Sequence, residues 1–244
     1  MFEKVTIVVS ATDESESLIK TVDTIVDSCA TGDIYEFLVV IPSNAAAECL
    51  EAIDFLKNKY PGKVRELIQR RPGIGGGMRD AIDEINTSHI MFLSADIPIG
   101  LDVVPVMIEK SKRQPEKIVK ISRWSENGSF YGYGKVRKAF NYLAQIFLKI
   151  LYSFEYTEFT CPVLISPTHI YKKINFRELG FPCLLEAVLI PIRLGHKIEE
   201  IPAKCFPRTE GKSKNSAAKT AMYLFTALRV RFAPKRKLIK SKDK

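Results

Sequence analysis

Charged side chains that follow short apolar runs are the residues of this sequence best placed to do chemistry. Asp13 and Glu14 come after the run Val5–Ser10, Asp96 comes after residues 89–93, and Arg123 comes after residues 117–122. A carboxylate at the end of a strand is rigidly mounted and suits a hard divalent cation, and a guanidinium suits a phosphate. The same residues also have simpler interpretations, because Asp96 can cap a turn and Glu14 can sit in the first turn of a helix.

The elements that would hold these side chains alternate between strand and helix through residue 122. The strands are predicted at Val5–Ser10 and at residues 37–41, 64–68, 89–93 and 117–122, with helices predicted after most of them, at residues 45–60, 78–85 and 103–112 among others. Runs of this kind are typical of strands buried on both faces. The alternation predicts an α/β fold with a mostly parallel sheet flanked by helices, and such sheets bind ligands at the carboxyl ends of their strands.

The second half of the chain is predicted to add further helices and strands. Residues 136–152 and 216–232 both have apolar stripes at helical spacing, which are most often core helices. Residues 159–166 and 198–206 are predicted strands, and Pro202 favours a sheet edge for the second. Residues 73–77, Gly-Ile-Gly-Gly-Gly, are predicted to be a loop that lets the backbone approach a ligand or, more simply, a flexible turn.

Composition and charge exclude several classes of protein. The 244 residues are 46% hydrophobic and 27% charged, which fits a globular chain and not a disordered one. Residues 204–244 contain 13 Lys or Arg and two acids, while residues 1–203 contain 24 basic and 26 acidic side chains, so the net charge of +9 comes from the C-terminal end. A basic tail of this kind favours an anionic partner or, more simply, a solvated end of the chain.

Several familiar site patterns are missing. The three histidines have no metal-binding spacing, no G-x-S-x-G elbow occurs, and the Gly-Lys-Ser of residues 211–213 lacks the earlier glycine of a phosphate-binding loop. No RNA-binding signature is found. Five cysteines without a C-x-x-C pair, and no leader-like start, indicate reduced thiols in the cytoplasm.

Short motifs nevertheless follow one another along most of the chain. The N-terminal ones are VVSATDE at residues 8–14, the glycine-rich segment at residues 73–77 and MFLSAD at residues 91–96. The later ones are Ile-Ser-Arg ending at Arg123, Thr-Glu ending at Glu158, Glu186 on an apolar helix, Glu-Ile-Pro at residues 200–202 and RTEGKSK at residues 208–214.

In this order the motifs resemble those of family 2 glycosyltransferases with the GT-A fold, over about residues 5–232. The closest resemblance is to the branch that glycosylates dolichyl or polyprenyl phosphate, which has E-V-P followed by R-x-x-G-x-S-K. The resemblance implies a glycosyltransferase domain at residues 1–215, with a nucleotide-sugar half at 1–122 and an acceptor half at 123–215. Residues 216–244 would form an amphipathic helix and a basic tail.

The resemblance also implies roles for individual residues. Asp96 would bind Mg²⁺ or Mn²⁺, and Asp96, Glu158 and Arg123 would be catalytic. The nucleotide-sugar donor would be bound by residues from the first half and one glutamate from the second: Ser10, Thr12, Asp13, Glu14, Ser43, Gly73, Gly75, Gly77, Ser94 and Glu186. The phosphate of the acceptor would be bound by Arg123, Arg208, Ser213 and Lys214. If Glu186 is buried and structural, Arg123 or Arg208 is its expected partner.

Three alternatives remain at this stage. The family has carboxylates where this chain has Ile41, Pro42 and Ser94, so the first is a non-catalytic subunit with the same fold. The second is a glycosyltransferase with another acceptor in cell-surface polysaccharide synthesis. The third is a nucleic-acid-binding module, and the acidic balance of residues 1–203 argues against it.

The leading hypothesis is an inverting enzyme that moves a hexose from a nucleotide sugar to a lipid phosphate at the cytoplasmic face of a membrane. Leu224, Phe225, Leu228 and Phe232 are predicted to face the membrane, with the basic tail on anionic headgroups. The uncharged part of this helix is too short to cross a bilayer, so attachment would be peripheral, directly to lipid or through a membrane protein as a partner.

Overall fold

The computed structural model describes residues 1–95, 100–132, 134–161, 163–206 and 217–241. The strands are β1 (Val5–Ser10), β2 (Ile34–Ile41), β3 (Val64–Ile68), β4 (His89–Ser94), β5 (Ile118–Ser122), β6 (Ser129–Phe130), β7 (Leu164–Pro167), β8 (Ile198–Pro202) and β9 (Lys204–Cys205). The helices are α1 (Glu16–Ser28), α2 (Ala47–Lys59), α3 (Gly73–Glu84), α4 (Val103–Arg113), α5 (Lys135–Tyr152), α6 (Thr168–Lys173), α7 (Cys183–Leu194), α8 (Ala217–Phe232) and α9 (Lys235–Leu238).

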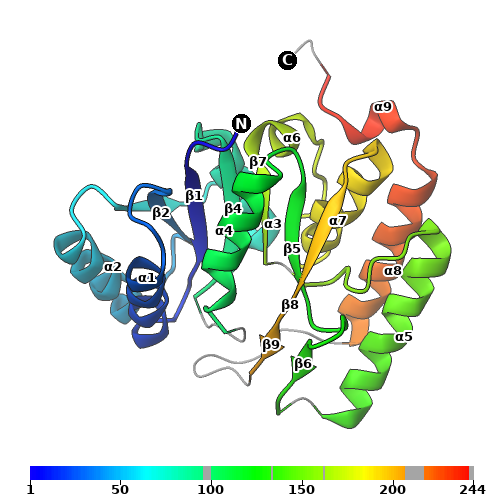
Figure 1. Ribbon diagram of the computed structural model, residues 1–244, viewed down its shortest axis with the longest axis horizontal. Helices are drawn as coiled ribbons and strands as arrows, with labels where there is room; N and C mark the ends of the chain where they lie inside the picture. Colours follow the sequence, from blue (N-terminus) through cyan, green and yellow to red (C-terminus); the bar gives the residue numbers. More distant parts are fainter. Residues whose placement is uncertain (96–99, 133, 162, 207–216, 242–244) are drawn as a thin grey trace.

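Seven strands form the central sheet in the order β3-β2-β1-β4-β7-β5-β8 (Figure 1). β7 is antiparallel to both of its neighbours, and the other neighbouring pairs are parallel. β6 and β9 form a separate, short parallel pair. The predicted α/β fold with a mostly parallel sheet is therefore confirmed, and Pro202 ends an edge strand as expected.

Helices cover both faces of the sheet (Figure 1). On one face, Ile7 and Val9 of β1 pack in the same apolar cluster as α1, α2 and α4. On the other face, Val8 packs with α3, α6 and α7. α8 packs against α7, and α5 lies beside α8, so these two helices form an additional layer at one side of the molecule.

The topology brings the ends of the parallel strands to one edge of the sheet. Ser10 at the end of β1 is in register with Ser94 at the end of β4, and Val40 near the end of β2 is in register with Ser10 on its other side. β5 is parallel to β4 because each is antiparallel to β7. Ser122 and Arg123 therefore follow β5 at the same edge as the residues that follow β1, β2 and β4.

Three local features of the structure differ from the expectations of the sequence. Residues 73–77 are the first turns of α3 and not a loop. The strand predicted at residues 159–166 is shorter and later, Leu164–Pro167, and Phe159 and Cys161 are buried outside it. The six-residue helix α6 was not predicted, because a segment this short has too few residues to show a helical period.

Candidate active site

The loop after β1 is tied together by one of its own carboxylates. Oε2 of Glu14 accepts hydrogen bonds from the backbone N–H groups of Thr12 (2.8 Å) and Asp13 (3.2 Å). The carbonyl of Thr12 in turn accepts a hydrogen bond from Ala46 N (2.9 Å), just before α2. Glu14 therefore shapes the loop, while Asp13 and, after β2, Ser43 are exposed at the sheet edge.

A buried carboxylate that the sequence analysis did not single out holds the loop before α3. Asp80 is fully buried, and its Oδ2 accepts hydrogen bonds from the backbone N–H groups of Arg70 (2.6 Å) and Arg71 (3.0 Å). The Arg71 side chain donates to the other oxygen of Asp80 and to Asp83 (3.0 Å). Nothing in the sequence marks Asp80, because its partners lie nine and ten residues earlier and meet it only after folding.

The glycines of α3 pack closely against the protein's own chain, in addition to the ligand contact predicted for residues 73–77. A Cβ atom at Gly73 would lie 2.3 Å from the carbonyl oxygen of Leu179, and one at Gly75 would lie 2.2 Å from that of Glu178. A Cβ at Gly77 would meet the Gln69 side chain at 2.7 Å. These positions need glycine so that α3 can pack against neighbouring backbone and side chains, whether or not a ligand also approaches.

Glu186 fixes the segment on which α3 packs. It is fully buried near the start of α7, where its Oε2 accepts hydrogen bonds from the backbone N–H groups of Arg177 (3.0 Å) and Glu178 (2.9 Å). Its ion-pair partner is Arg229 of α8 (2.5 Å), so the expected pairing with Arg123 is wrong, and Arg208 lies outside the described residues. Burial raises the pKa of Glu186, while Arg229 and the two backbone N–H groups oppose that shift.

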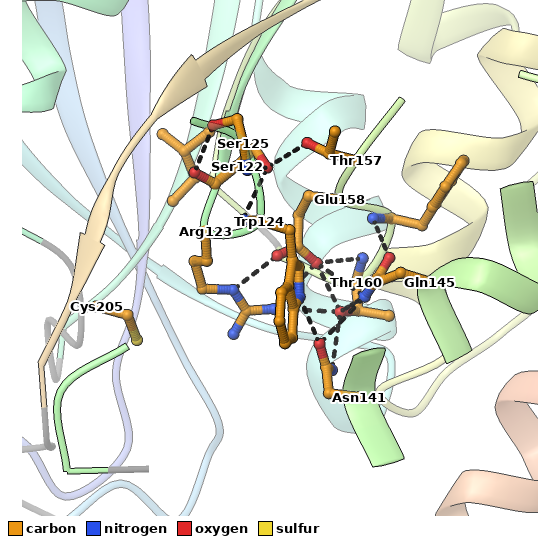
Figure 2. Close-up of polar contacts among 12 residues, drawn as sticks. Ser122, Arg123, Trp124, Ser125, Asn141, Gln145, Thr157, Glu158, Thr160 and Cys205 are labelled. Carbon is orange, nitrogen blue, oxygen red and sulfur yellow. Dashed lines mark hydrogen bonds and ion pairs between the residues drawn. The ribbon is translucent and has the colours of Figure 1, made fainter. Parts of the chain in front are cut away.

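Arg123 and Glu158 form a buried ion pair beyond the end of β5 (Figure 2). Nε of Arg123 donates to Oε2 of Glu158 (2.7 Å), and Nη2 donates to Oε1 (3.0 Å). Thr160 donates to Oε1 through its backbone N–H (3.0 Å) and its hydroxyl (2.8 Å), and Nε2 of Gln145 donates to the same oxygen (3.2 Å). The structure thus brings these two predicted residues together and fixes them from several elements.

Two further residues shape this pair. The carboxylate of Glu200, from the Glu-Ile-Pro motif, accepts hydrogen bonds from the backbone N–H groups of Thr157 (2.8 Å) and Glu158 (2.9 Å). Oγ of Ser122 accepts from the backbone N–H groups of Trp124 (3.1 Å) and Ser125 (3.0 Å), which turns the chain at Arg123. Glu200 therefore orients Glu158, and Ser122 orients Arg123.

The charge state of the pair is set by burial and by its partners. Burial alone would raise the pKa of Glu158, but Arg123, Lys120 and the Thr160 hydrogen bond lower it to about 2. Lys120 is also fully buried, and its Nζ donates to the backbone carbonyls of Glu158 (2.8 Å) and Ile121 (3.2 Å). Burial lowers the pKa of Lys120. Glu158 is therefore an anion at neutral pH and a poor acceptor of protons.

Several predicted site residues lie outside the described residues: Asp96, Arg208, Ser213 and Lys214. Within the described ranges, no group of three or more His, Cys, Asp or Glu side chains could hold a metal ion. No helix there is both long and apolar enough to span a membrane. All five cysteines are free thiols.

Comparison with known proteins identifies a family for most of the chain. The family model described as "Glycosyl transferase family 2" matches residues 6–180. This match includes the β1 loop, α3, the end of β4 and the Arg123–Glu158 pair.

Solved structures of glucosyl-3-phosphoglycerate synthase from Mycobacterium tuberculosis have a similar fold. The structure in complex with Mn²⁺, UDP and phosphoglyceric acid has a TM-score of 0.73 at 15% identity, over 95% of this chain and 80% of that one. The structure with Mn²⁺, UDP-glucose and phosphoglyceric acid has a TM-score of 0.72 at 14% identity, over 95% and 81%. The structure with Mg²⁺ and UDP has a TM-score of 0.70 at 15% identity, over 95% and 80%.

Proposed function

The chain belongs to glycosyl transferase family 2 and is a glycosyltransferase with the GT-A fold, and from this premise we propose that it transfers a hexose from a nucleotide sugar to the phosphate of a polyprenyl lipid. The oxygen of the acceptor phosphate would form the new bond to the anomeric carbon of the sugar while the bond from that carbon to the donor diphosphate breaks. The nucleoside diphosphate leaves with the bonding electrons. A single displacement of this kind inverts the anomeric configuration.

The observation that best supports a phosphate acceptor is the state of the Arg123–Glu158 pair. Glu158 is fully buried, its pKa is about 2, and its carboxylate already accepts several hydrogen bonds, so it is unsuited to remove a proton from a hydroxyl group. A phosphate acceptor is already an anion and needs no strong base. Among the described residues, Nη1 of Arg123 has no hydrogen-bond partner, which leaves one donor nitrogen for an anion.

We assign the donor to the edge formed by the ends of β1, β2 and β4. Ser10, Thr12, Asp13, Ser43 and Ser94 lie at this edge and offer polar groups to a nucleotide sugar. Glu14 would act by holding the β1 loop, and Glu186 by holding the segment that packs on Gly73 and Gly75. Glu158 is likewise a positioning residue for Arg123, and Arg208, Ser213 and Lys214 remain proposed phosphate ligands.

We propose Mg²⁺ or Mn²⁺ as the cofactor, with Asp96 as its protein ligand. The described residues do not form a metal cluster by themselves, so the assignment depends on Asp96 and on the donor diphosphate, both of which offer hard oxygen ligands. When bound, the ion would offset the negative charge that develops on the leaving diphosphate. The structures of glucosyl-3-phosphoglycerate synthase contain Mn²⁺ or Mg²⁺ together with UDP, which supports this assignment.

Membrane attachment belongs to the same proposal. Leu224, Phe225, Leu228 and Phe232 of α8 are exposed, as expected for a helix that lies on a bilayer. Free thiols are consistent with a position at the cytoplasmic face. A second candidate acceptor is a small soluble phosphate compound, which is favoured by the phosphoglyceric acid present in the similar structures.

A transfer assay tests the function. The purified protein is incubated with Mn²⁺ and radiolabelled UDP-, GDP- or dTDP-sugars, and with either undecaprenyl phosphate, dolichyl phosphate or phosphoglyceric acid. We expect an organic-soluble labelled product with inverted anomeric configuration from one of the sugars. Transfer to phosphoglyceric acid alone would support the second candidate, and no transfer from any common sugar nucleotide would refute the proposal.

A further inference from the structure

α5 is oriented with its apolar stripe away from the protein. Val136, Phe140, Leu143 and Ile150, which recur at helical spacing, are between 60% and 75% exposed. The opposite side of the helix is buried and includes two polar residues, Asn141, which is half-buried, and Gln145, which is 2% exposed. A helix normally buries its apolar stripe, so the outward stripe of α5 indicates a surface with an apolar partner.

The polar side of α5 has a specific reason to face inward. Oδ1 of Asn141 accepts a hydrogen bond from Nε1 of Trp124 (2.9 Å), beside Arg123 (Figure 2). Gln145 donates to the Glu158 carboxylate and accepts from the backbone N–H of Phe159 (2.8 Å). α5 therefore contacts the Arg123–Glu158 pair on one side and presents apolar side chains on the other.

α8 continues this outward surface. The two helices are joined by a hydrogen bond from the Tyr152 hydroxyl to the carbonyl of Ala227 (2.8 Å) and by one from Nε of Arg231 to the carbonyl of Leu151 (2.7 Å). Phe225 and Phe232 of α8 are 67% and 72% exposed. Figure 1 shows α5 and α8 side by side at the edge of the molecule, beyond α7.

The positive charge around this surface indicates which kind of partner it binds. Lys135–Tyr152 contains four Lys or Arg and no acid, and residues 217–241 contain seven Lys or Arg and no acid. Of these seven, Arg229 and Lys240 are paired with Glu186 and Asp83, and the others add positive charge to this part of the chain. A second copy of the chain would bring like charges together across the same surface. An anionic lipid bilayer offers both an apolar interior for the stripes and negative headgroups for the cations.

We propose that α5 and α8 together form the membrane-docking surface, with the stripe of α5 inserted among the lipid chains. This inference rests on the proposed lipid acceptor and extends it. Because the inner side of α5 contacts Glu158 and Trp124, docking places the Arg123–Glu158 pair next to the membrane from which a lipid phosphate would be drawn. The apolar part of the anchor then includes α5 as well as α8, while the basic residues contact the headgroups.

Vesicle flotation of the full chain tests the proposal. We expect binding to vesicles of phosphatidylglycerol and phosphatidylcholine, and a loss of at least about tenfold in partitioning for the triple variant Phe140→Ser, Leu143→Ser, Ile150→Ser. The matched control is Phe55→Ser, since Phe55 is 50% exposed on α2, at the other side of the molecule. Equal binding of the triple variant and the wild type, or no binding of the wild type, would overturn the proposal.

Tryptophan fluorescence gives an independent measurement of insertion. The chain contains a single tryptophan, Trp124, whose emission is measured in the wild type with and without vesicles and subtracted. Phe140→Trp should add emission that shifts to the blue and is quenched by brominated lipids, whereas Phe55→Trp should not respond. Analytical ultracentrifugation tests the other possible partner. If the wild type self-associates and the triple variant is a monomer, the partner is instead a second copy of the chain.

An activity assay with a short, water-soluble prenyl phosphate as acceptor distinguishes failure of this proposal from failure of the proposed function. The triple variant should keep that activity and lose transfer to vesicle-embedded undecaprenyl phosphate. If the wild type binds vesicles but transfers sugar to neither acceptor, the lipid-phosphate function fails while docking stands. If it transfers sugar to the soluble acceptor without binding vesicles, the docking surface fails while the function stands.

Discussion

At the end of β5, the charges of Arg123 and Glu158 depend on each other because both side chains are nearly removed from water. The exposed fractions are 11% for Arg123 and zero for Glu158. Removing one charge from such a pair leaves the other buried and unpaired, which costs more than the pair itself contributes. The consequence can be measured in both stability and pH dependence.

We predict that Glu158→Gln lowers the free energy of unfolding by about 3 kcal/mol at neutral pH, because Arg123 loses its partner. The pKa of Glu158 is lowered from 4.5 to about 2 in the folded chain. The stabilisation from this carboxylate is therefore complete above about pH 4.5 and is lost as the pH falls toward 2. Urea unfolding across this pH range should show that the free energy of unfolding falls less steeply toward acid pH for Glu158→Gln than for the wild type. Glu51→Gln, an exposed control on α2, should change neither the free energy of unfolding at neutral pH nor its decrease at acid pH.

The proposed metal ligand gives a second prediction at the residue scale. Asp96→Ala should abolish metal-dependent binding of nucleoside diphosphates and leave the thermal unfolding temperature close to that of the wild type. A carboxylate just after a strand contributes little to packing, whereas it is the acidic residue proposed to hold the ion. Calorimetric titration with Mn²⁺ measures binding, and EDTA should reproduce the effect in the wild type. Full activity of the wild type in EDTA would refute the metal role.

Sequence motifs located the Arg123–Glu158 pair but not the residues that support it. Arg123, Glu158 and the Glu-Ile-Pro motif were recognisable because they belong to short motifs that follow one another along the chain in a familiar order. Lys120, Asp80 and Gln145 were not, because a charged or polar residue in a strand or helix shows no special spacing when its partners are distant in sequence. Their roles depend on contacts that exist only in the folded chain.

Among the elements, α3 shows how tightly one helix can be positioned by its glycines. Gly75→Ala should destabilise the protein by about 1–3 kcal/mol, because the new Cβ would lie 2.2 Å from the carbonyl oxygen of Glu178 and 2.8 Å from Cβ of Cys183. Backbone atoms cannot move aside as a flexible side chain does. The control is Gly32→Ala, since no atom lies within 4 Å of a Cβ at Gly32. Similar urea midpoints for the two variants would contradict this explanation.

Most strands and helices of the sheet layer could be predicted from hydrophobic period alone. β1 and β3 have the predicted bounds, and α2 and α4 differ by one or two residues at their ends. The hydrophobic period of a sequence does not reveal which side of a helix faces the interior of the protein. The stripe of α5 resembles that of a core helix, yet Asn141 and Gln145 face inward because Trp124 and Glu158 need their hydrogen bonds.

For the molecule as a whole, the excess positive charge is concentrated at the layer of α5 and α8 together with α9, which contain ten Lys or Arg and no acid. The sequence located the basic residues but not the arrangement of the C-terminal end. Leu238 is 2% exposed, and Lys240 donates its backbone N–H to the carbonyl of Lys173 (2.8 Å). Nζ of Lys240 pairs with Asp83 of α3 (3.2 Å), so this lysine is part of the folded structure and is not free for headgroups.

Lys235 and Lys237 are exposed on α9, and they give the prediction that tests the charge of this layer. The double variant Lys235→Glu, Lys237→Glu should bind anionic liposomes at least about tenfold more weakly, since each cation near such a surface adds about 1 kcal/mol. Its binding to neutral liposomes should change little, and the difference should shrink as salt screens the headgroups. Lys4→Glu, Lys20→Glu makes the same change of charge just before β1 and on α1, and should retain binding. If both double variants lose binding equally, net charge and not this layer directs the protein to the membrane.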